Sequence, residues 1–572
     1  MGSMVRAVAV DYDGTLTDTD VPDGEVLAAV REARARGQVV VLVTGRILSE
    51  LRADFPAVDG EFDAIVAENG AVLAGAHGVR DLAEPVDPRL GNALARRDVL
   101  VRQGRVLLAC DAKHADTVYD EVDRLGMDYQ LVRNRAALMV LPGGVTKGTG
   151  LAAALGDLGI SRHSTIGVGD AENDHHLLAT CELGVAVANA VEPLKRRADL
   201  VLDEPAGTGV AALLRSPLLQ GNATLPPRHW RLTLGEDDQR QPVHIPASQI
   251  NLLLTGGSCS GKSHFAGLLI EQLAQMEYSV LVIDGEGDHG PLTARQGTIA
   301  VGGRGPLPSP EHLNALLCHR FGSVVLDLSH HDPPAQDAYL QAIAPMVMAQ
   351  RAATGLPHWI FVEEAHTLSV ASGPWADALA GGDKGFCFST YLPELLPHTA
   401  HAAVDHIVVT AGDGVGARDS IAYTAAQVDL ELDAMTKALG RERGRALLVA
   451  GHDDAPVAFT VAARNSVHVR HWHKYITGQL PPDLRFYFAP PDDNRIAANL
   501  REFHRHLSVC QPQTISQHAR QHDFSRWASD VLKDEHFART VEHIEEQLSE
   551  GRQSSAECRA AITQAIEDRY LE

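Results

Sequence analysis

The sequence predicts two successive α/β domains followed by an α-helical domain. Up to residue 465, short apolar runs alternate with helical patterns and end in Asp, Thr-Gly or Gly-rich turns. This alternation is typical of parallel sheets whose carboxyl strand ends carry a site. From Asn494 onward, apolar residues recur at helical spacing instead. Because 572 residues are also too many for one core, several domains are expected.

The composition is that of a globular protein with reduced thiols. Hydrophobic residues make up 45% of the chain, and its seven cysteines form no C-x-x-C pair, which disfavours a disulfide framework or a zinc ribbon. No run of about eighteen apolar residues and no signal peptide is visible, so we expect a cytoplasmic protein without a membrane partner. A net charge of −24 disfavours a broad nucleic-acid-coating surface but leaves a local basic channel open.

Two aspartates one residue apart follow the first apolar run. Residues 5–17 read VRAVAVDYDGTLT, so a short strand ends at Asp11 and Asp13. Alternate side chains of an extended segment share a face, so the two carboxylates would converge at the carboxyl end of the strand. Converging carboxylates repel each other unless a cation or a shared proton separates them. The pair therefore predicts a Mg²⁺ site.

Three further motifs follow before residue 215. Residues 39–46 read VVVLVTGR, Lys147 opens an Ala- and Leu-rich helix, and residues 166–174 read IGVGDAEND. Together with the aspartate pair, they resemble the haloacid dehalogenase (HAD) phosphatase superfamily, in its Cof-like branch. The resemblance covers residues 1–215. It implies a HAD Rossmann-like domain with a cap inserted at about residues 75–142.

The resemblance implies a role for each motif residue. Asp11 would be the nucleophile that forms an aspartyl-phosphate, and Asp13 would be the general acid/base. Thr44 would hydrogen-bond the transferring phosphoryl group, and Lys147 would balance its charge. The carboxylates implied to bind Mg²⁺ are Asp11, Asp13, Asp170 and Asp174, with Asn173 in support.

Three parts of this domain bear on the substrate. Residues 68–70, Glu-Asn-Gly, are similar to the Cof-like pattern, and Arg46 is either a contact for the substrate phosphate or a solvated residue at a helix start. In the cap, strand-like runs at 105–110 and 137–141 flank a helical stretch at 114–125. A short cap of this kind predicts a phosphorylated, sugar-like small molecule as the substrate.

A Pro-, Gly- and polar-rich segment at residues 216–245 separates the two α/β domains. Within it, residues 230–235 and 242–246 flank an acidic turn and predict a small hairpin. The second domain is therefore expected at residues 246–465.

The second domain opens with an apolar run and a glycine-rich loop, NLLLTGGSCSGKS at residues 251–263. The match to G-x-x-x-x-G-K-[ST] predicts a phosphate-binding loop for ATP in a P-loop NTPase α/β domain. Gly256 and Gly261 would let backbone N–H groups point inward, with Ser260 in the same nucleotide-binding set. Lys262 would reach the β- and γ-phosphates, and Ser263 would bind the Mg²⁺ of the nucleotide.

A later strand, HWIFVEEAH at residues 358–366, ends in two adjacent glutamates. A carboxylate at a buried strand end can hold Mg²⁺ through water, and its neighbour can polarise the attacking water. With the phosphate loop, this segment resembles the HerA/FtsK clade of hexameric translocating ATPases, whose motif typically reads Asp-Glu-Ala-His. Glu363 departs from that aspartate at the metal-side position, whereas Glu364 matches the catalytic glutamate.

Two further features resemble the clade in part. Residues 385–393 are similar to its next strand, but Tyr391 stands where a glutamine usually senses the γ-phosphate. Three arginines in a later turn are either fingers for a neighbouring subunit or a solvated basic turn: Arg441, Arg443 and Arg445. The resemblance implies a homo-oligomeric ring, with a hexamer suspected, and DNA as a candidate partner.

Two other functions stay open for the second domain. Residues 256–288 are also similar to small-molecule P-loop kinases, in which an aspartate after the second strand contacts the acceptor hydroxyl. The chain would then be a kinase–phosphatase, although the glutamate pair is a water-activating arrangement that wastes ATP in a kinase. A nucleotide-gated scaffold that controls the phosphatase is the other alternative.

Residues 466–572 predict a mainly helical domain. Three histidines lie close to Trp472, at His468, His471 and His473, but they match no known metal-site spacing. Apolar stripes at helical spacing predict the core of the domain or a subunit contact: Ile496, Leu500, Phe503, Phe524, Trp527, Val531, Leu532, Phe537, Val541, Ile544 and Leu548. The predicted role is an interaction module.

Overall fold

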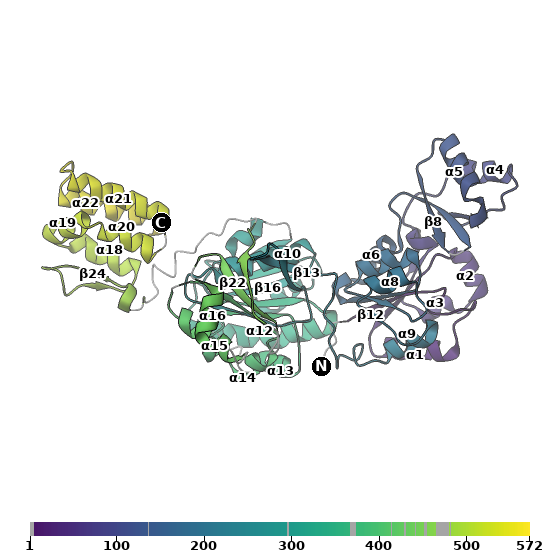
Figure 1. Cartoon of the computed structure of the whole chain (residues 1–572), viewed down its shortest axis with the longest axis horizontal. Coiled ribbons are helices and arrows are strands. Elements are labelled where there is room, and N and C mark those ends of the chain that lie inside the picture. The colour runs from purple at the N-terminus through teal and green to yellow at the C-terminus, as the bar shows by residue number, and fades with distance from the viewer. Residues whose placement is uncertain are drawn as a thin grey trace. The chain divides into compact units, whose positions relative to one another are not determined.

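The computed structural model describes residues 5–134, 136–294, 297–366, 373–412, 414–427, 431–440, 442–450, 455–464, 480, 482–532 and 534–571. The chain forms two compact units, Met1–Gly285 with His289–Val467 and Glu286–Asp288 with His468–Glu572. Both predicted α/β sheets belong to the first unit. Figure 1 shows the strands and helices of each. None of the helices among the described residues has the length and apolar character needed to cross a bilayer.

The first sheet contains eight strands within the described residues. In spatial order they are β12 (Leu200–Val201), β11 (Leu183–Ala186), β10 (Thr165–Gly169), β1 (Ala7–Asp11), β2 (Val39–Val43), β3 (Ala64–Ala67), β4 (Val72–Gly75) and β5 (Gly78–Asp81). The pairs from β12 to β3 are parallel, whereas β3–β4 and β4–β5 are antiparallel. The central strand β1 is buried along its whole length, which explains its continuous apolar run.

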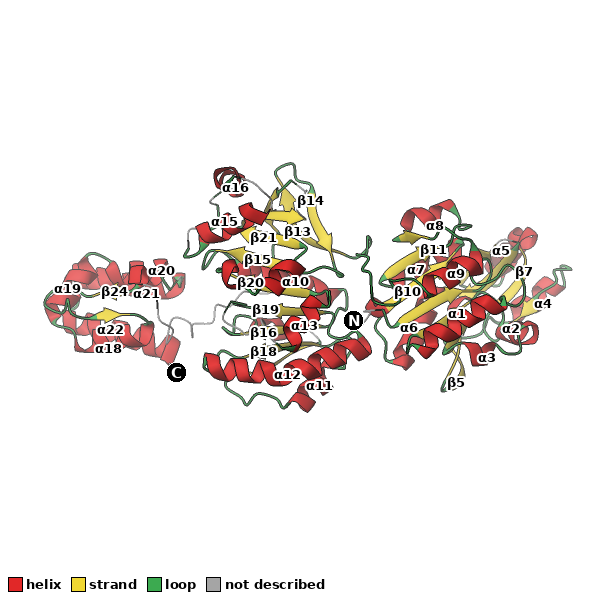
Figure 2. Cartoon of the chain, turned by 90° about the horizontal axis from the view of Figure 1, so that it is seen from below, coloured by secondary structure: helices red, strands yellow, loops and turns green. Residues whose placement is uncertain are grey.

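Helices flank this sheet (Figure 2). They are α1 (Gly24–Ala35), α2 (Leu48–Asp54), α3 (Val58–Glu61), α6 (Lys147–Leu158), α7 (His175–Thr180), α8 (Glu192–Arg197) and α9 (Ala206–Leu214). Val30 of α1 and Leu151 of α6 belong to the same buried core as the strands. Together with the mainly parallel sheet, this packing gives the predicted HAD Rossmann-like architecture.

A smaller antiparallel sheet is inserted between β5 and α6. Its order is β6 (Arg102–Gln103), β7 (Leu108–Asp111), β9 (Ala137–Pro142) and β8 (Tyr129–Asn134). It packs with α4 (Pro88–Ala95) and α5 (Ala115–Arg124) around a core of its own, which includes Leu94, Val118 and Val140. A separate core makes this segment a cap on the first sheet.

The second sheet carries the phosphate loop. Its order is β14 (Pro242–Pro246), β13 (Arg231–Asp237), β23 (Val457–Val461), β22 (Arg445–Ala450), β21 (His406–Thr410), β15 (Leu252–Gly256), β20 (Phe386–Thr390), β19 (Trp359–Val362), β16 (Val280–Asp284), β18 (Ser323–Asp327) and β17 (Thr298–Gly302). The strands from β21 to β17 are parallel. The predicted hairpin is the antiparallel pair β13–β14 at one edge.

Helices cover both faces of the second sheet. They are α10 (Lys262–Gln275), α11 (Pro310–Leu317), α12 (Pro333–Thr354), α13 (Pro374–Ala380), α14 (His398–Ala403), α15 (Ala417–Gln427) and α16 (Leu432–Leu439). Successive residues of β15 alternate between two cores, because side chains of a strand point to opposite faces. Leu252 and Leu254 pack in the core that contains α10, and Leu253 packs in the core that contains α12.

The second unit is mainly helical, as predicted. A short ladder of β24 (Phe486–Tyr487) and β25 (Ile496–Ala497) precedes α18 (Leu500–Val509), α19 (Pro512–Arg520), α20 (Asp523–Asp530), α21 (Glu535–Ser549) and α22 (Ser555–Ile566). The predicted apolar stripes lie in its core, for example Phe503, Trp527 and Val541. Ile496 differs from the expectation, since it lies on the edge ladder with 43% of its surface exposed.

Candidate active sites

The first candidate site lies at the carboxyl edge of the first sheet. Asp11 ends β1, and Asp170 follows the neighbouring parallel strand β10. Asp174 lies one short turn further on, and Lys147 opens α6. The start of α6 is fixed by a capping box, in which Thr146 and Thr149 exchange side-chain and backbone hydrogen bonds. Four motif residues separated by up to 163 positions are thereby brought together.

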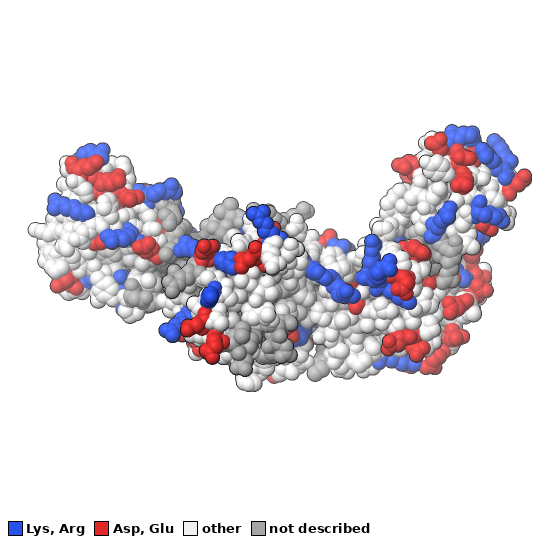
Figure 3. Space-filling view, in the orientation of Figure 1, with Lys and Arg blue, Asp and Glu red and all other residues white. Residues whose placement is uncertain are grey.

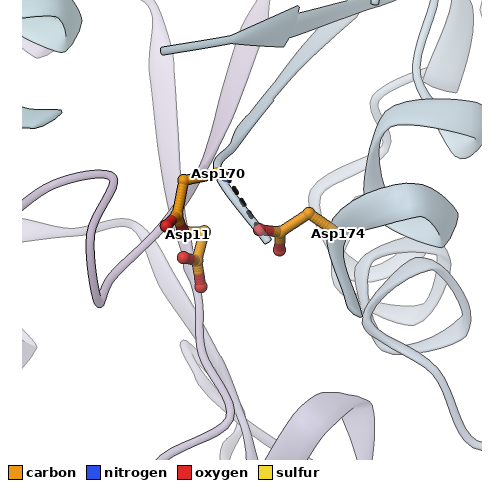
Figure 4. Close-up of side chains that lie close together, drawn as sticks. All are labelled: Asp11, Asp170 and Asp174. Atoms are coloured by element: carbon orange, nitrogen blue, oxygen red, sulfur yellow. Dashed lines mark hydrogen bonds between the residues drawn. The ribbon is translucent and has the colours of Figure 1, made fainter. Parts of the chain in front are cut away.

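Lys147 is the centre of this site. Its Nζ donates to Asp11 Oδ1 at 2.5 Å and to Asp174 Oδ1 at 2.6 Å, and all three side chains are buried. The backbone N–H of Asp170 donates to Asp174 Oδ2 at 3.0 Å (Figure 4). Thr15 Oγ1 donates to Asp170 Oδ1 at 3.1 Å. Each carboxylate is therefore held by at least one fixed donor.

The electrostatics of the cluster are those of a cation site. Burial, followed by Asp174, raises the pKa of Asp11, although Lys147 acts in the opposite direction. Burial disfavours the charge of Lys147, but Asp11 and Asp174 outweigh it and raise the pKa of Lys147. Three carboxylates lie together with one lysine, which pairs with two of them, so further positive charge would stabilise the ionised cluster.

Asp11, Asp170 and Asp174 can hold a metal ion. Each offers an oxygen, and these atoms lie within 4.8 Å of one another, the one such group found among the described residues. Oxygen donors of this type fit Mg²⁺. The side chain of Asp13, which we also expected to bind the metal, lies outside this group and pairs with Arg46.

Asp13 and Arg46 are the partly exposed side chains beside the buried cluster, and Thr44 lies next to Arg46. Arg46 donates to Asp13 Oδ1 from both Nε, at 3.0 Å, and NH2, at 2.7 Å. It also pairs with Asp20 and Asp54. Thr44 is fully buried and its Oγ1 accepts the backbone N–H of Arg46 at 3.0 Å. Acidic side chains therefore hold Arg46 beside Asp13, and its contact with a substrate phosphate stays a prediction.

Glu68 links the site to the cap. Its buried carboxylate accepts the backbone N–H groups of Arg105, Val106 and Leu107, at 2.9, 2.9 and 3.0 Å. The adjacent Asn69 accepts from Asn173 Nδ2 at 3.3 Å. The sequence pattern singled out this segment but gave no partner for it, since a contact across 37 residues has no local signal.

The second candidate site is the phosphate loop between β15 and α10. Gly256 and Gly261 have φ values of 142° and 100°, which side chains other than glycine rarely adopt. Ser260 Oγ lies 2.6 Å from Thr410 Oγ1, on the neighbouring strand β21. Lys262 Nζ donates to the carbonyls of Gly256 and Gly257, both at 3.1 Å. The loop therefore holds its lysine on its own backbone. Ser263 is half-buried in the first turn of α10.

The glutamate pair, Glu363 and Glu364, follows β19. In the sheet, β20 separates β19 from β15, the strand that leads into the phosphate loop. Glu363 is buried and accepts from His289 Nε2 at 2.9 Å, while the backbone N–H of His289 donates to Asp284 Oδ2 at 2.8 Å. His289 was not predicted, because nothing in its local sequence marks a partner 74 residues away. The histidine supplies a donor to the glutamate that replaces the expected aspartate.

Glu364 is held in a strained backbone position with φ at +47°. Its Oε2 lies 3.4 Å from His366 Nδ1, which is 2.9 Å from Thr390 Oγ1 at the end of β20. The Tyr391 ring packs edge-on against His366, with Lys262 Nζ 5.7 Å from its centroid. Tyr391 thus lies between the phosphate loop and the glutamate pair.

The candidate arginine fingers are only partly covered by the structure. Arg443 is exposed, and Arg445 pairs with Asp238 of the same chain at 2.8 Å. Arg441 and the histidines His468, His471 and His473 lie outside the described residues. The pairing of Arg445 leaves Arg443 as the candidate finger with the greater freedom to reach a neighbour.

Two parts of the chain match known protein families in sequence. Residues 104–214 match the model of the haloacid dehalogenase-like hydrolase family, and residues 238–343 match that of the central domain of the helicase HerA. A phosphoglycolate phosphatase of Methanothermobacter thermautotrophicus is 34% identical over 220 residues, covering 37% of this chain and 98% of the relative. One from Methanopyrus kandleri is 32% identical over 240 residues, covering 38% and 100%.

A solved haloacid dehalogenase-like hydrolase from Bacteroides thetaiotaomicron has 20% identity and a TM-score of 0.32, and the match covers 37% of this chain and 98% of that one. On the sequence matches, the chain belongs to the haloacid dehalogenase-like hydrolase family. It also carries a HerA-like domain, so both resemblances found in the sequence are confirmed.

Proposed function

We propose that the chain is a bifunctional hydrolase, with a phosphomonoesterase in residues 1–215 and an ATPase in residues 246–465. The bridge from Lys147 to Asp11 and Asp174 carries the first assignment. The bridge puts a fixed cation between Asp11, which we propose as the nucleophile, and Asp174, and Asp170 lies in the same buried group. Family membership and the phosphoglycolate phosphatase relatives support the same activity.

The proposed chemistry takes the roles that the family resemblance implies for these side chains. An oxygen of Asp11 would attack phosphorus and form an aspartyl-phosphate, while Asp13 gives its proton to the leaving oxygen. Asp13 would then take a proton from water as that water releases phosphate from Asp11. Asp11, Asp170 and Asp174 would hold Mg²⁺, which supplies positive charge beside the transferring phosphoryl group. For Asp13 to act in this way, its ion pair with Arg46 has to loosen.

The relatives make phosphoglycolate the first substrate to test, beside a panel of sugar phosphates. Phosphate release should require Mg²⁺ and fall by about a thousandfold or more in Asp11→Asn, because the nucleophile is lost. Asp18→Asn, the same change at an exposed position, should retain full activity. Retained turnover in Asp11→Asn would exclude the phosphoenzyme mechanism.

The ATPase assignment rests on the loop geometry and on the glutamate pair beyond β20. Glu364 would orient the attacking water, and Lys262 and Ser263 would contact the nucleotide and its Mg²⁺. Glu364→Gln should reduce ATP hydrolysis by about a hundredfold with little change in ATP affinity. The matched control is Glu394→Gln on the surface. Equal ATP consumption in both variants would contradict the assignment.

Hydrolysis is supported over transfer to an acceptor. In the kinase alternative, an aspartate after the second strand of the domain contacts the acceptor hydroxyl. Asp284, which ends β16, is fully buried and accepts the His289 N–H group. A carboxylate turned into the protein is poorly placed to meet an acceptor.

We include ring assembly and DNA as parts of the proposal that rest on the HerA-family match. On the face drawn in Figure 3, Lys and Arg are interspersed with Asp and Glu, so charge alone marks no DNA surface there. Light scattering with and without ATP should show a hexamer, and DNA should accelerate ATP hydrolysis. A monomer with DNA-independent hydrolysis would reduce the proposal to a simple ATPase.

A further inference from the structure

A buried polar cluster joins the phosphatase domain to the P-loop domain within the first unit. Its centre is Glu182, which lies directly before β11 and is 3% exposed. Tyr278 OH donates to Glu182 at 2.8 Å, and Ser248 Oγ donates to the same carboxylate. His163 Nδ1 lies 2.7 Å from Glu182 Oε2. We call these four residues, Ser248, Glu182, His163 and Tyr278, the junction cluster.

The junction cluster is fully engaged. His163 Nε2 lies 2.7 Å from the carbonyl oxygen of Met276, so each ring nitrogen faces an acceptor. The Tyr278 ring stacks on the His163 ring, with the ring centroids 3.5 Å apart. Burial, followed by Glu182, raises the pKa of Tyr278, which keeps its hydroxyl a donor. A satisfied buried network of this kind fixes one relative position of the groups that form it.

The junction cluster lies at the amino edges of both sheets. His163 and Glu182 precede β10 and β11, whereas Tyr278 and Ser248 precede β16 and β15. Both candidate sites lie at the opposite, carboxyl edges. The contact therefore leaves both sites open while joining the elements that carry them.

One rigid element leads from each site to the junction cluster. Helix α10 begins in the phosphate loop at Lys262 and ends at Gln275, directly before Met276, a span of about 21 Å. On the other side, β10 runs from the His163 turn to Asp170 of the acidic cluster. A shift of α10 on nucleotide binding would move Met276 and Tyr278 relative to His163 and Glu182. That movement would in turn displace the turn that leads into β10.

We propose that the junction cluster couples the two sites, so that a nucleotide at the phosphate loop changes the activity of the phosphatase domain. Glu182 and Tyr278 act as positioning residues, since neither touches a reacting group. The inference rests on the proposed functions. Because coupling between sites is reciprocal, an oxyanion at the Asp11 site should change nucleotide affinity by the same factor.

The test measures kcat/KM for p-nitrophenyl phosphate and phosphoglycolate on the full chain, with and without a non-hydrolysable ATP analogue and Mg²⁺. The analogue should change kcat/KM at least threefold in the wild type. Tyr278→Phe keeps the stacked ring and removes only the hydroxyl, and Glu182→Gln removes only the charge; both should lose most of the response. Tyr119→Phe and Glu192→Gln, at exposed positions, should keep it.

Three outcomes separate the inference from the proposed functions. Without analogue binding, judged by a fluorescent nucleotide, the ATPase proposal and the coupling both fail. Without turnover of either phosphoester, the phosphatase proposal fails, and the coupling is read from hydrogen exchange of residues 162–186 on addition of the analogue. If binding and turnover are present but the response is absent, or persists unchanged in Glu182→Gln and Tyr278→Phe, the coupling is wrong.

Discussion

The two candidate sites differ in how far the fold assembles them. In the first site, Lys147 already bridges Asp11 and Asp174. In the second, Lys262 donates to the backbone of its own loop and Glu363 accepts from His289, so the nucleotide-binding groups face local partners. A buried cluster of like charges is stable only if a cation is present, so the first site needs Lys147 in place. The lysine of the phosphate loop can instead donate to loop carbonyls until nucleotide phosphates replace them.

The largest effect is expected from a substitution that removes the cation of the first site. Lys147→Met leaves Asp11 and Asp174 buried without their shared cation. We expect phosphatase turnover to fall by about a thousandfold and the free energy of unfolding to fall by about 3–5 kcal/mol. Lys113→Met, at an exposed position, is the control. Calorimetry and steady-state kinetics on both variants measure the two effects, and an undiminished unfolding temperature in Lys147→Met would contradict the bridge.

The corresponding change in the second site should affect binding and spare stability. Lys262→Ala removes two hydrogen bonds to loop carbonyls, so the free energy of unfolding should change by only about 1 kcal/mol. ATP affinity should fall by about a hundredfold or more, because the charge on the β- and γ-phosphates is lost. Equilibrium titration with a fluorescent nucleotide gives the affinity. If Lys262→Ala strongly lowered the free energy of unfolding but left ATP affinity unchanged, the proposed difference between the two sites would be contradicted.

The same contrast explains what the sequence could predict. Asp11, Asp170 and Lys147 follow strand ends or open a helix, and the carboxyl ends of parallel strands meet at one edge, so their convergence follows from local patterns. The phosphate loop is also local. The contacts that tune each site join residues that are distant in sequence, and no local pattern gives the partner, as shown by Arg46 on Asp13, Glu68 on the cap backbone, and His289 on Glu363.

A smaller effect tests whether His289 prepares Glu363 for its role. His289→Ala removes the Nε2 donor and should lower ATP turnover by about tenfold, with ATP affinity within about threefold of the wild type. His289→Gln can still donate from its amide and should recover part of the turnover. His312→Ala, an exposed histidine of α11, is the control. Equal turnover in His289→Ala and the wild type would show that the contact has no catalytic value.

The last expected effect concerns stability alone and lies in the helical unit, away from both sites. Burial raises the pKa of Glu545 to about 7, despite hydrogen bonds from the backbone N–H groups of Ser525 and Phe524. A raised pKa in the folded state means stability that is present below about pH 4.5 and is lost as pH rises through 7, by up to about 3 kcal/mol.

Hydrogen exchange of α20 and α21 in the full chain, corrected for intrinsic rates, should show protection falling between pH 5 and pH 8. Glu545→Gln should remove most of this dependence, and Glu542→Gln on the surface should keep it. A pH-independent wild type would place the Glu545 titration outside this range.

The central claim is that one chain holds two separate hydrolytic sites, and it is tested most directly by following the γ-phosphate of labelled ATP in Asp11→Asn. This variant lacks the proposed phosphatase nucleophile, so it should not hydrolyse a phosphorylated product. Phosphate that the second domain transferred to an acceptor would then stay on that acceptor and would not be counted as hydrolysis. With and without DNA, and with a metabolite extract as acceptor, the account predicts that all label appears as free phosphate. Label on an organic acceptor would contradict it and make the second domain a kinase.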